Sequence, residues 1–138
     1  MDGFKVVVPV QVRFRDIDAF GHVNNAVYLN YCEQCRFAYF RRFGYAARAG
    51  DLPVILARVE VDFRYPTRLE QEVRVGGRTV RLGESSFAME HRIEADGVLA
   101  AEVKVVLVAY DYESARPAPI PGELRARIAA FEGIPERS

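Results

Sequence analysis

The chain has 138 residues, half of them hydrophobic and 12% aromatic, which is enough for one domain with its own core over residues 1–138. Its 19 basic and 19 acidic residues give a formal net charge of zero, so overall charge does not support a nucleic-acid or membrane-surface partner. It has neither an apolar run of roughly 18 residues nor a basic segment leading into an apolar one at the N-terminus, so a soluble, cytoplasmic protein is expected.

The first predicted element is a strand over residues 5–15. Apolar side chains occupy every even position from Val6 to Phe14, which is the period of a strand with one buried face. Pro9 cannot donate a backbone hydrogen bond, so this strand is expected to be bent or to lie at a sheet edge. The residues from Asp16 to Val23 favour irregular backbone and predict a turn.

A long helix is predicted next. Asn24 or Asn25 is a suitable N-cap, and the helix is expected to reach about Phe43, where Gly44 provides a natural stop. Its apolar residues run most of the way round, which is typical of a helix that is buried on more than one side. A loop is expected from Tyr45 to Pro53.

The second half of the chain is rich in strands. Four are predicted, at Val54–Tyr65, Gln71–Leu82, Ser86–Ile93 and Val98–Ala109. Gly76-Gly77 suggests a bulge, and Asp96-Gly97 is a strong hairpin signal. An extended segment, a short amphipathic helix and a frayed tail are expected at Arg116–Pro121, at Gly122–Phe131 and after Gly133. One long helix beside a run of antiparallel strands indicates an α+β fold.

Two aspartates lie just before the predicted helix. Asp18 could interact with the helix N-terminus, act as a general base, or act as a nucleophile, and the residues alone leave these three roles open. Asp16 is expected mainly to accept hydrogen bonds within the turn. The first N–H groups of a helix have no acceptor, so the Asn25 N–H could hold a developing oxyanion. His22 could be a general acid or base, a substrate hydrogen-bond donor, or a surface turn residue.

Three other residues are of types that can ligate a metal or take part in catalysis. Cys32 and Cys35 form a Cys-x-x-Cys pair, but no second Cys or His pair completes a zinc site, so two buried or half-buried thiols and no metal are expected. His91 lies between Glu90 and Arg92 in a predicted strand, where a solvated or cross-strand position is expected.

The motif Asp16-x-Asp18-x-x-Gly21-His22-Val23-Asn24-Asn25-x-x-Tyr28-Leu29, followed by an aromatic helix, resembles the hot-dog-fold acyl-CoA thioesterases of the 4-hydroxybenzoyl-CoA thioesterase type. Segments 61–66, 83–87, 101–103 and 119–121 agree with this resemblance, which covers about residues 5–130.

The resemblance implies an antiparallel sheet wrapped around the long helix. It also implies that subunits pair edge to edge as a homodimer or homotetramer, with the active site at the interface. The implied reaction is hydrolysis of an acyl-CoA thioester without metal or organic cofactor. Asp18 would be the nucleophile or general base, and the thioester oxygen would point at the Asn25 N–H.

The sequence His22-Val23-Asn24-Asn25 also resembles acyl-ACP and medium- to long-chain acyl-CoA branches, which leaves the substrate class open. An acyl-ACP thioesterase and a non-catalytic acyl-thioester-binding protein are the alternatives. Beyond Asp18 and Asn25, the expected site residues are His22 and Asn24 for the carbonyl or the attacking water, Tyr28 and Cys32 for the acyl pocket, and Arg64, Arg78 and Arg81 for the CoA phosphates.

Overall fold

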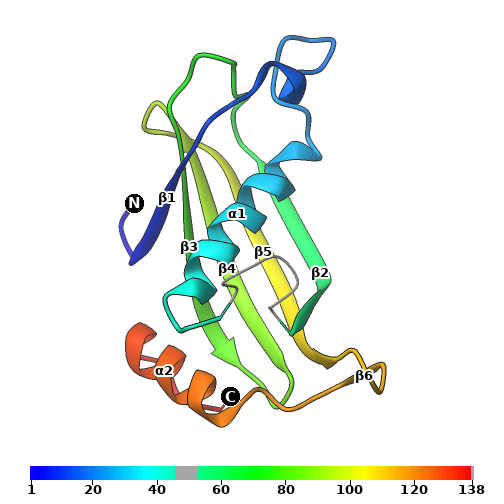
Figure 1. The fold of residues 1–138 in the computed structure, drawn as a ribbon. Coiled ribbons are helices and arrows are strands. Elements are labelled where there is room, and N and C mark those ends of the chain that lie inside the picture. The colour runs from blue at the N-terminus through cyan, green and yellow to red at the C-terminus, as the bar shows by residue number, and fades with distance from the viewer. Residues whose placement is uncertain (46–52, 138) are drawn as a thin grey trace.

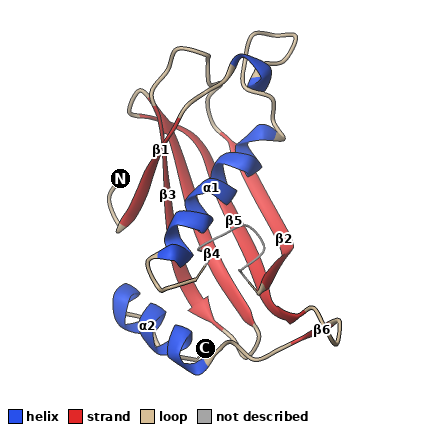
Figure 2. Cartoon of the chain, in the orientation of Figure 1, coloured by secondary structure: helices blue, strands red, loops and turns tan. Residues whose placement is uncertain are grey.

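The computed structural model describes residues 1–45 and 53–137, and it shows helix α1 lying across one face of a six-stranded antiparallel sheet (Figure 1, Figure 2). The strands lie in the order β1-β3-β4-β5-β2, and β6 pairs with the end of β5. The elements are β1 (Val6–Val10), a 3-10 helix (Phe14–Asp16), α1 (Val27–Arg41), β2 (Val54–Phe63), β3 (Val73–Leu82), β4 (Ser86–Ala95), β5 (Val98–Asp111), β6 (Arg116–Pro117) and α2 (Gly122–Glu132). The predicted α+β architecture is confirmed. The loop expected at 45–53 falls mostly on residues 46–52, outside the described residues.

Strand β1 is shorter than predicted. It ends at Val10 because the chain then turns into the 3-10 helix, where the Asp16 carboxylate accepts the Arg13 N–H at 2.9 Å. Phe14, expected on the inward face of a longer strand, is consequently 84% exposed. The edge position expected from Pro9 is confirmed, since β1 pairs only with β3 at one end of the sheet.

The core lies between α1 and the sheet. Alternate residues of the strands face the helix, and Val103, His91 and Gly77 are neighbours across β5, β4 and β3 on this inner face. His91 is only 2% exposed and its Nδ1 contacts the Gly76 carbonyl of β3, so of the two expected positions the cross-strand one is confirmed and the solvated one is wrong. The parity of strand β4 directs its odd positions toward α1, and the charged neighbours Glu90 and Arg92 point to the other face.

The two glycines of β3 do not form the expected bulge. Gly76 and Gly77 keep regular pairing with both β1 and β4, and the register shift comes later, between Thr79 and Arg81. A Cβ on Gly77 would lie 2.8 Å from the Cys35 Sγ, and one on Gly76 would lie 2.8 Å from the Phe4 ring. These positions therefore need glycine for close approach rather than for an unusual backbone angle.

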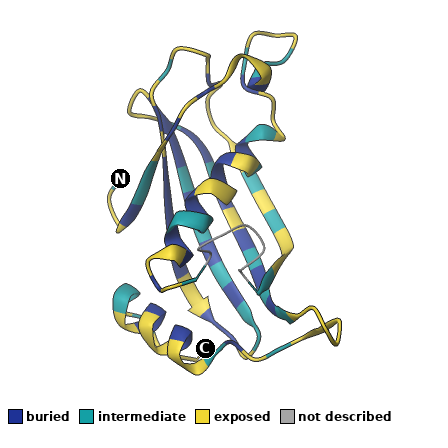
Figure 3. Ribbon diagram, in the orientation of Figure 1, coloured by how far each residue is buried: buried dark blue, intermediate teal, exposed yellow. Residues whose placement is uncertain are grey.

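Strand β2 is the least covered part of the sheet. It forms the edge opposite β1, and α1 lies closest to β1 and β3. On its inner face Leu56 and Phe63 remain 46% and 48% exposed, and Figure 3 shows β2 mostly in the colours of partial or full exposure. An apolar edge strand of this length can pair with another chain.

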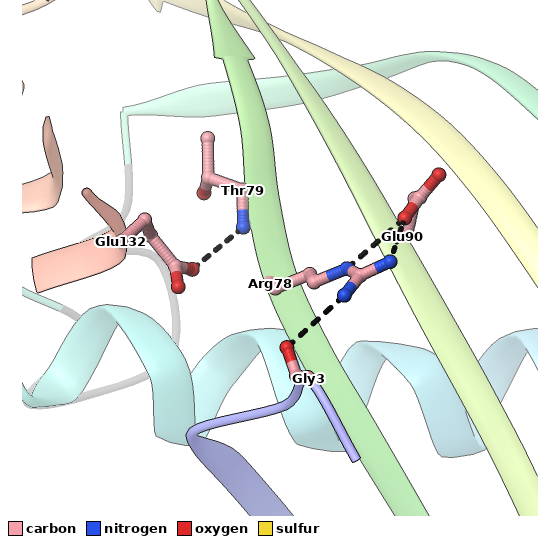
Figure 4. Close-up of polar contacts among 5 residues, drawn as sticks. All are labelled: Gly3, Arg78, Thr79, Glu90 and Glu132. Atoms are coloured by element: carbon pink, nitrogen blue, oxygen red, sulfur yellow. Dashed lines mark hydrogen bonds and ion pairs between the residues drawn. The ribbon is translucent and has the colours of Figure 1, made fainter. Parts of the chain in front are cut away.

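Helix α2 is anchored at its C-terminal end. The Glu132 carboxylate accepts a hydrogen bond from the Tyr39 hydroxyl at 2.7 Å. It also accepts one from the Thr79 N–H at 2.8 Å (Figure 4), on the edge of β3 beyond the end of β1. Gly133 ends the helix in a left-handed conformation. Ile134 then packs against the core, so the expectation of a tail frayed from Gly133 onward is wrong.

Candidate active site

A pocket of about 370 Å³ lies where the loop before α1 meets the end of β2. It brings together five of the predicted site residues, namely Asp18, His22, Asn25, Tyr28 and Arg64. Its remaining lining comes from Phe20, Val23, Phe63, Tyr65 and Pro66. Asn24, Arg78 and Arg81 do not line it.

The Asp18 carboxylate is fixed through one oxygen. Its Oδ1 accepts the N–H groups of Phe20 at 2.8 Å and His22 at 3.2 Å. The loop is closed by the Asp18 N–H, which donates to the His22 carbonyl, and by Gly21, which adopts φ 82°. Oδ2 accepts no hydrogen bond from residues 1–45 or 53–137, so it is available to a substrate or a water molecule.

Asp16 supports this loop from below. Its buried carboxylate accepts hydrogen bonds from the Arg13 N–H at 2.9 Å, the Arg13 guanidinium at 3.1 Å and the Tyr31 hydroxyl at 2.8 Å. Burial opposes ionisation, but these hydrogen bonds outweigh it and hold the pKa of Asp16 below its ordinary value. Burial and the Asp16 carboxylate raise the pKa of Tyr31, which stays protonated as a donor. The structural role expected for Asp16 is confirmed.

The helix start differs from the prediction. The N-cap is Ala26 and regular α1 geometry begins at Val27, one or two residues later than expected. Asn24 fixes the turn that leads into the helix. Its Oδ1 accepts the Ala26 N–H and its carbonyl accepts the Val27 N–H, both at 2.9 Å. The chain therefore makes one tight turn before the helix becomes regular. The Asn24 side chain is used in this turn and does not enter the pocket.

Asn25 lies in this turn, on the wall of the pocket. Its N–H makes no hydrogen bond within the described part of the chain, whereas the Asn24 N–H donates to the Asp16 carbonyl at 2.8 Å. The free donor therefore lies at the position the sequence indicated, although it belongs to the turn before α1. An N–H beside a carboxylate can stabilise negative charge that develops on a carbonyl oxygen.

Tyr28 forms the inner wall of the pocket. It is 2% exposed, its ring lies 5.3 Å from that of Phe63, and its hydroxyl donates to Thr67 Oγ1 at 2.9 Å. Thr67 was not identified from the sequence. Its carbonyl also accepts the Val23 N–H at 2.8 Å, so it joins the loop after β2 to both sides of the site. A single threonine in a polar loop carries no sequence signal for this role.

The three arginines expected to contact phosphates lie in different places. Arg64 lines the pocket and is paired with Glu102 at 2.9 Å. Arg78 lies on the outer face of the sheet, where it is paired with Glu90 at 2.7 Å and donates to the Gly3 carbonyl (Figure 4). Arg81 is exposed on β3 beside the register shift. Only Arg64 adjoins the pocket within one chain.

The two thiols have no catalytic surroundings. Cys32 and Cys35 are fully buried, and burial raises the pKa of each to about 12. The described residues contain no cluster of three or more His, Cys, Asp or Glu side chains that could hold a metal ion. The expectation of two buried thiols is confirmed.

Comparison with known proteins places the chain in a family. The sequence profile described as "Thioesterase-like superfamily" matches residues 12–128. The chain belongs to this superfamily. Membership confirms the predicted hot-dog fold, with its antiparallel sheet around a long central helix, and the predicted class of thioester hydrolase.

Individual relatives of this thioesterase-like chain are similar over most of its length. A thioesterase from Thermus thermophilus, crystallised with coenzyme A and Zn, is 48% identical, with a TM-score of 0.87 over 98% of this chain and 99% of that one. The long-chain acyl-CoA thioesterase FadM of Escherichia coli is 23% identical over 86% of this chain and 93% of its own length. A chloroplastic acyl-acyl carrier protein thioesterase of Arabidopsis thaliana is 28% identical over 90% of this chain and 67% of its own length.

Proposed function

We propose that the protein is an acyl-CoA thioesterase, which converts an acyl-CoA and water into a free acid and CoA. The observation that carries the proposal is the geometry of Asp18, which lines the pocket. Its Oδ1 is held by two backbone N–H groups, while its Oδ2 accepts no hydrogen bond from the described residues. Asn25, whose N–H makes no hydrogen bond within the described residues, lines the same pocket. The similarity to the Thermus thioesterase bound to coenzyme A supports the choice of substrate.

Two routes are open to the Asp18 carboxylate. As a nucleophile, Oδ2 attacks the thioester carbon, the C–S bond breaks, the thiolate leaves and takes up a proton from solvent, and water hydrolyses the mixed anhydride. As a general base, Oδ2 removes a proton from water while the water oxygen attacks the same carbon. In both routes the Asn25 N–H stabilises the oxyanion. Neither route requires a metal or organic cofactor.

Other polar groups assist in this scheme. The His22 ring adjoins the pocket and would contact the acyl carbonyl or the attacking water, while Asn24 sets the turn that presents Asn25. Arg64 would contact a CoA phosphate at the mouth. Arg78 and Arg81 lie away from this pocket, so they would meet a CoA phosphate only where the substrate crosses onto another subunit.

We propose further that the enzyme is a homodimer or homotetramer. The free edge of β2, with half-exposed Leu56 and Phe63, supports edge-to-edge pairing. Phe63 also lines the Asp18 pocket, so a second subunit on this edge would complete the site. An active monomer at dilute concentration would contradict this arrangement.

A cytoplasmic location is proposed from composition alone. Within the described ranges, neither helix combines the length and apolar character required to span a bilayer.

Two alternatives follow from specific observations. An acyl-ACP thioesterase is supported by the 28% identity to the Arabidopsis enzyme. A non-catalytic acyl-thioester-binding protein would need the pocket without the chemistry, but the fixed Asp18 carboxylate favours catalysis over binding alone.

The test measures thiol release from a panel of alkyl and aryl acyl-CoAs, with the same acyl groups also presented on an acyl carrier protein. Asp18→Asn and Asp18→Ala should lower kcat by roughly 10²–10⁴-fold. Glu123→Gln, an exposed carboxylate on α2, is the matched control and should retain full activity. Full activity in the Asp18 variants would refute the mechanism. Binding of acyl-CoA without thiol release by the wild type would favour the binding protein.

The same enzyme can distinguish the two routes. In a single turnover in heavy-oxygen water, an unlabelled product acid with label in Asp18 would identify attack by an Asp18 oxygen, followed by opening of the anhydride at the aspartyl carbonyl. If the product acid is labelled, trapping of the acyl group on Asp18 by hydroxylamine would identify the anhydride, and its absence would favour direct attack by water.

A further inference from the structure

Arg36 is a buried cation on the face of α1 that is turned toward β4. It is 8% exposed, and its guanidinium NH1 lies 3.3 Å from the His91 Nε2. Cys32 and Phe40, four residues before and after it, are also buried, and Phe40 contacts Phe87 of β4 at 5.8 Å between ring centres. Residues four apart share a helix face, so Arg36 points into the space between α1 and the sheet.

The partner of Arg36 carries no charge. The His91 Nδ1 lies 3.1 Å from the Gly76 carbonyl, which can only accept, so this nitrogen holds the proton and Nε2 accepts from Arg36. Burial, reinforced by the charge of Arg36, lowers the pKa of His91 to about 3. His91 therefore positions the guanidinium but does not neutralise it.

The described part of the chain supplies no anion to Arg36. None of its ion pairs, in residues 1–45 or 53–137, involves this guanidinium. The buried carboxylates of the described residues already have a cation of their own, since Asp16 pairs with Arg13 and Glu94 pairs with Arg92. Glu33, one turn earlier on α1, is exposed and lies beyond ion-pair distance. Arg125, the other buried arginine of the described residues, also has no anion there but donates to three backbone carbonyls, whereas Arg36 has only the neutral His91 nitrogen. A buried guanidinium with so few acceptors is unfavourable, which points to a negative group that arrives with a ligand.

Arg36 lies about two turns along α1 from a residue that lines the Asp18 pocket. Tyr28, which walls that pocket, lies eight residues before Arg36 on the same helix, or about 12 Å along the axis. Phe63 of β2 also lines the pocket. Val61, two residues before it on the same inner face of β2, lies in the same cross-strand row as His91. This strip of β2 is apolar and only partly covered. An acyl chain that leaves the pocket along α1 would run beside apolar side chains and end at Arg36.

We propose that Arg36 binds the distal carboxylate of the acyl group, and that the preferred substrates are ω-carboxyacyl thioesters of medium length. This assignment rests on the proposed thioesterase function and names its substrate class. A carboxylate would supply the missing negative charge, and it matches the planar fork of a guanidinium with two parallel hydrogen bonds. A methyl terminus would leave the cation unpaired.

The experiment compares adipoyl-, suberoyl- and sebacoyl-CoA with hexanoyl-, octanoyl- and decanoyl-CoA, which match them in chain length. Arg36→Met removes the charge at similar volume. It should lower kcat/KM for the best ω-carboxyacyl substrate by about 10- to 100-fold, the range expected for one charged hydrogen-bonding partner. The same variant should change kcat/KM for the methyl-terminated partners only a few-fold. Arg116→Met, an exposed arginine on β6, is the matched control. If Arg36→Met does not fold, Arg36→Lys keeps the charge without the fork and should lower the same preference partially.

Several results would overturn the assignment. Equal losses for both substrate series would indicate that Arg36 only supports the fold. A better rate with ω-hydroxyacyl-CoA than with the ω-carboxy compound would indicate that Arg36 binds a neutral acceptor rather than an anion. Dissociation of the oligomer in Arg36→Met, measured by size-exclusion chromatography, would indicate that a second subunit supplies the anion.

The failure of the two proposals can be distinguished. Turnover of octanoyl-CoA with neither turnover nor binding of suberoyl-CoA would leave the thioesterase function intact and refute the role of Arg36. Absence of thiol release from every substrate would refute the thioesterase function. Calorimetric binding of suberoyl-CoA against octanoyl-CoA, in wild type and Arg36→Met, would then still decide whether Arg36 recognises the carboxylate.

Discussion

Replacing Tyr31 by Phe removes one hydroxyl from the buried hydrogen bonds beneath the loop that carries Asp18. That hydroxyl donates to Asp16 Oδ2 at 2.8 Å, and the other donors to the carboxylate both come from Arg13. A hydrogen bond to a charged group contributes about 1.5–3 kcal/mol, and the site is too buried for water to replace the hydroxyl freely. The free energy of unfolding should fall by about that amount. Tyr112→Phe, which removes an exposed hydroxyl bonded to the Val54 carbonyl, should cost much less.

The pH dependence of this loss identifies its origin. The folded protein holds the pKa of Asp16 below its ordinary value of 3.8, so ionised Asp16 adds stability that is present above that value and is lost as the pH falls through the lower, folded pKa. Tyr31→Phe weakens this contribution. The gap in stability between wild type and variant should therefore be largest near neutral pH and should shrink in acid.

Urea denaturation followed by circular dichroism measures both effects, with all proteins at one concentration because association would also contribute to stability. Equal losses in Tyr31→Phe and Tyr112→Phe would refute the reasoning. So would a gap that stays constant as the pH falls from neutral into the acid unfolding transition, since the carboxylate would then not be the group involved.

Three further predictions concern the core and its cover. Gly77→Ala should destabilise the protein by about 1–3 kcal/mol, because its new Cβ would lie 2.8 Å from the Cys35 Sγ, and a double variant that also carries Cys35→Ala should recover part of the loss in urea denaturation. Glu132→Gln should cost about 1–2 kcal/mol by weakening the charged acceptor of the Thr79 N–H, and hydrogen exchange should accelerate at that amide more than in β5. Cys32 and Cys35 should resist iodoacetamide in the folded state at neutral pH, because burial raises the pKa of both thiols to about 12, and should react fully in denaturant; fast labelling without unfolding would contradict this burial.

Periodicity and turn chemistry were sufficient to predict most of the fold. The strand periods located β2 to β5, and Asp96-Gly97 marked a hairpin whose two residues both adopt positive φ. Those signals act locally, between neighbours in the chain. The failures came from contacts between distant segments, as at Gly77, where the reason for glycine is Cys35 on α1.

The site was predictable in part for the same reason. Asp18, His22 and Asn25 come from one short loop, so their proximity follows from the sequence alone. The roles of Thr67 and His91 depend on partners 39 and 55 residues away, Tyr28 and Arg36, which no local pattern reveals. The cross-strand position of His91 was among the expectations, but its burial was not, because its charged neighbours in sequence point to the opposite face of the sheet.

The anchor at Glu132 has a consequence for shortened forms of the protein. Beyond the end of β1, the backbone of β3 has no neighbouring strand on that side, and a carboxylate from α2 accepts the Thr79 N–H there. A chain that stopped before α2 would leave this donor unsatisfied. It would also expose a second unpaired sheet edge, on the opposite side of the sheet from β2. A subunit with one exposed sheet edge can pair with one other subunit and stop, whereas a subunit with two exposed edges can add further subunits without limit. Helix α2 therefore covers this edge, and its removal should promote fibrous or amorphous aggregation.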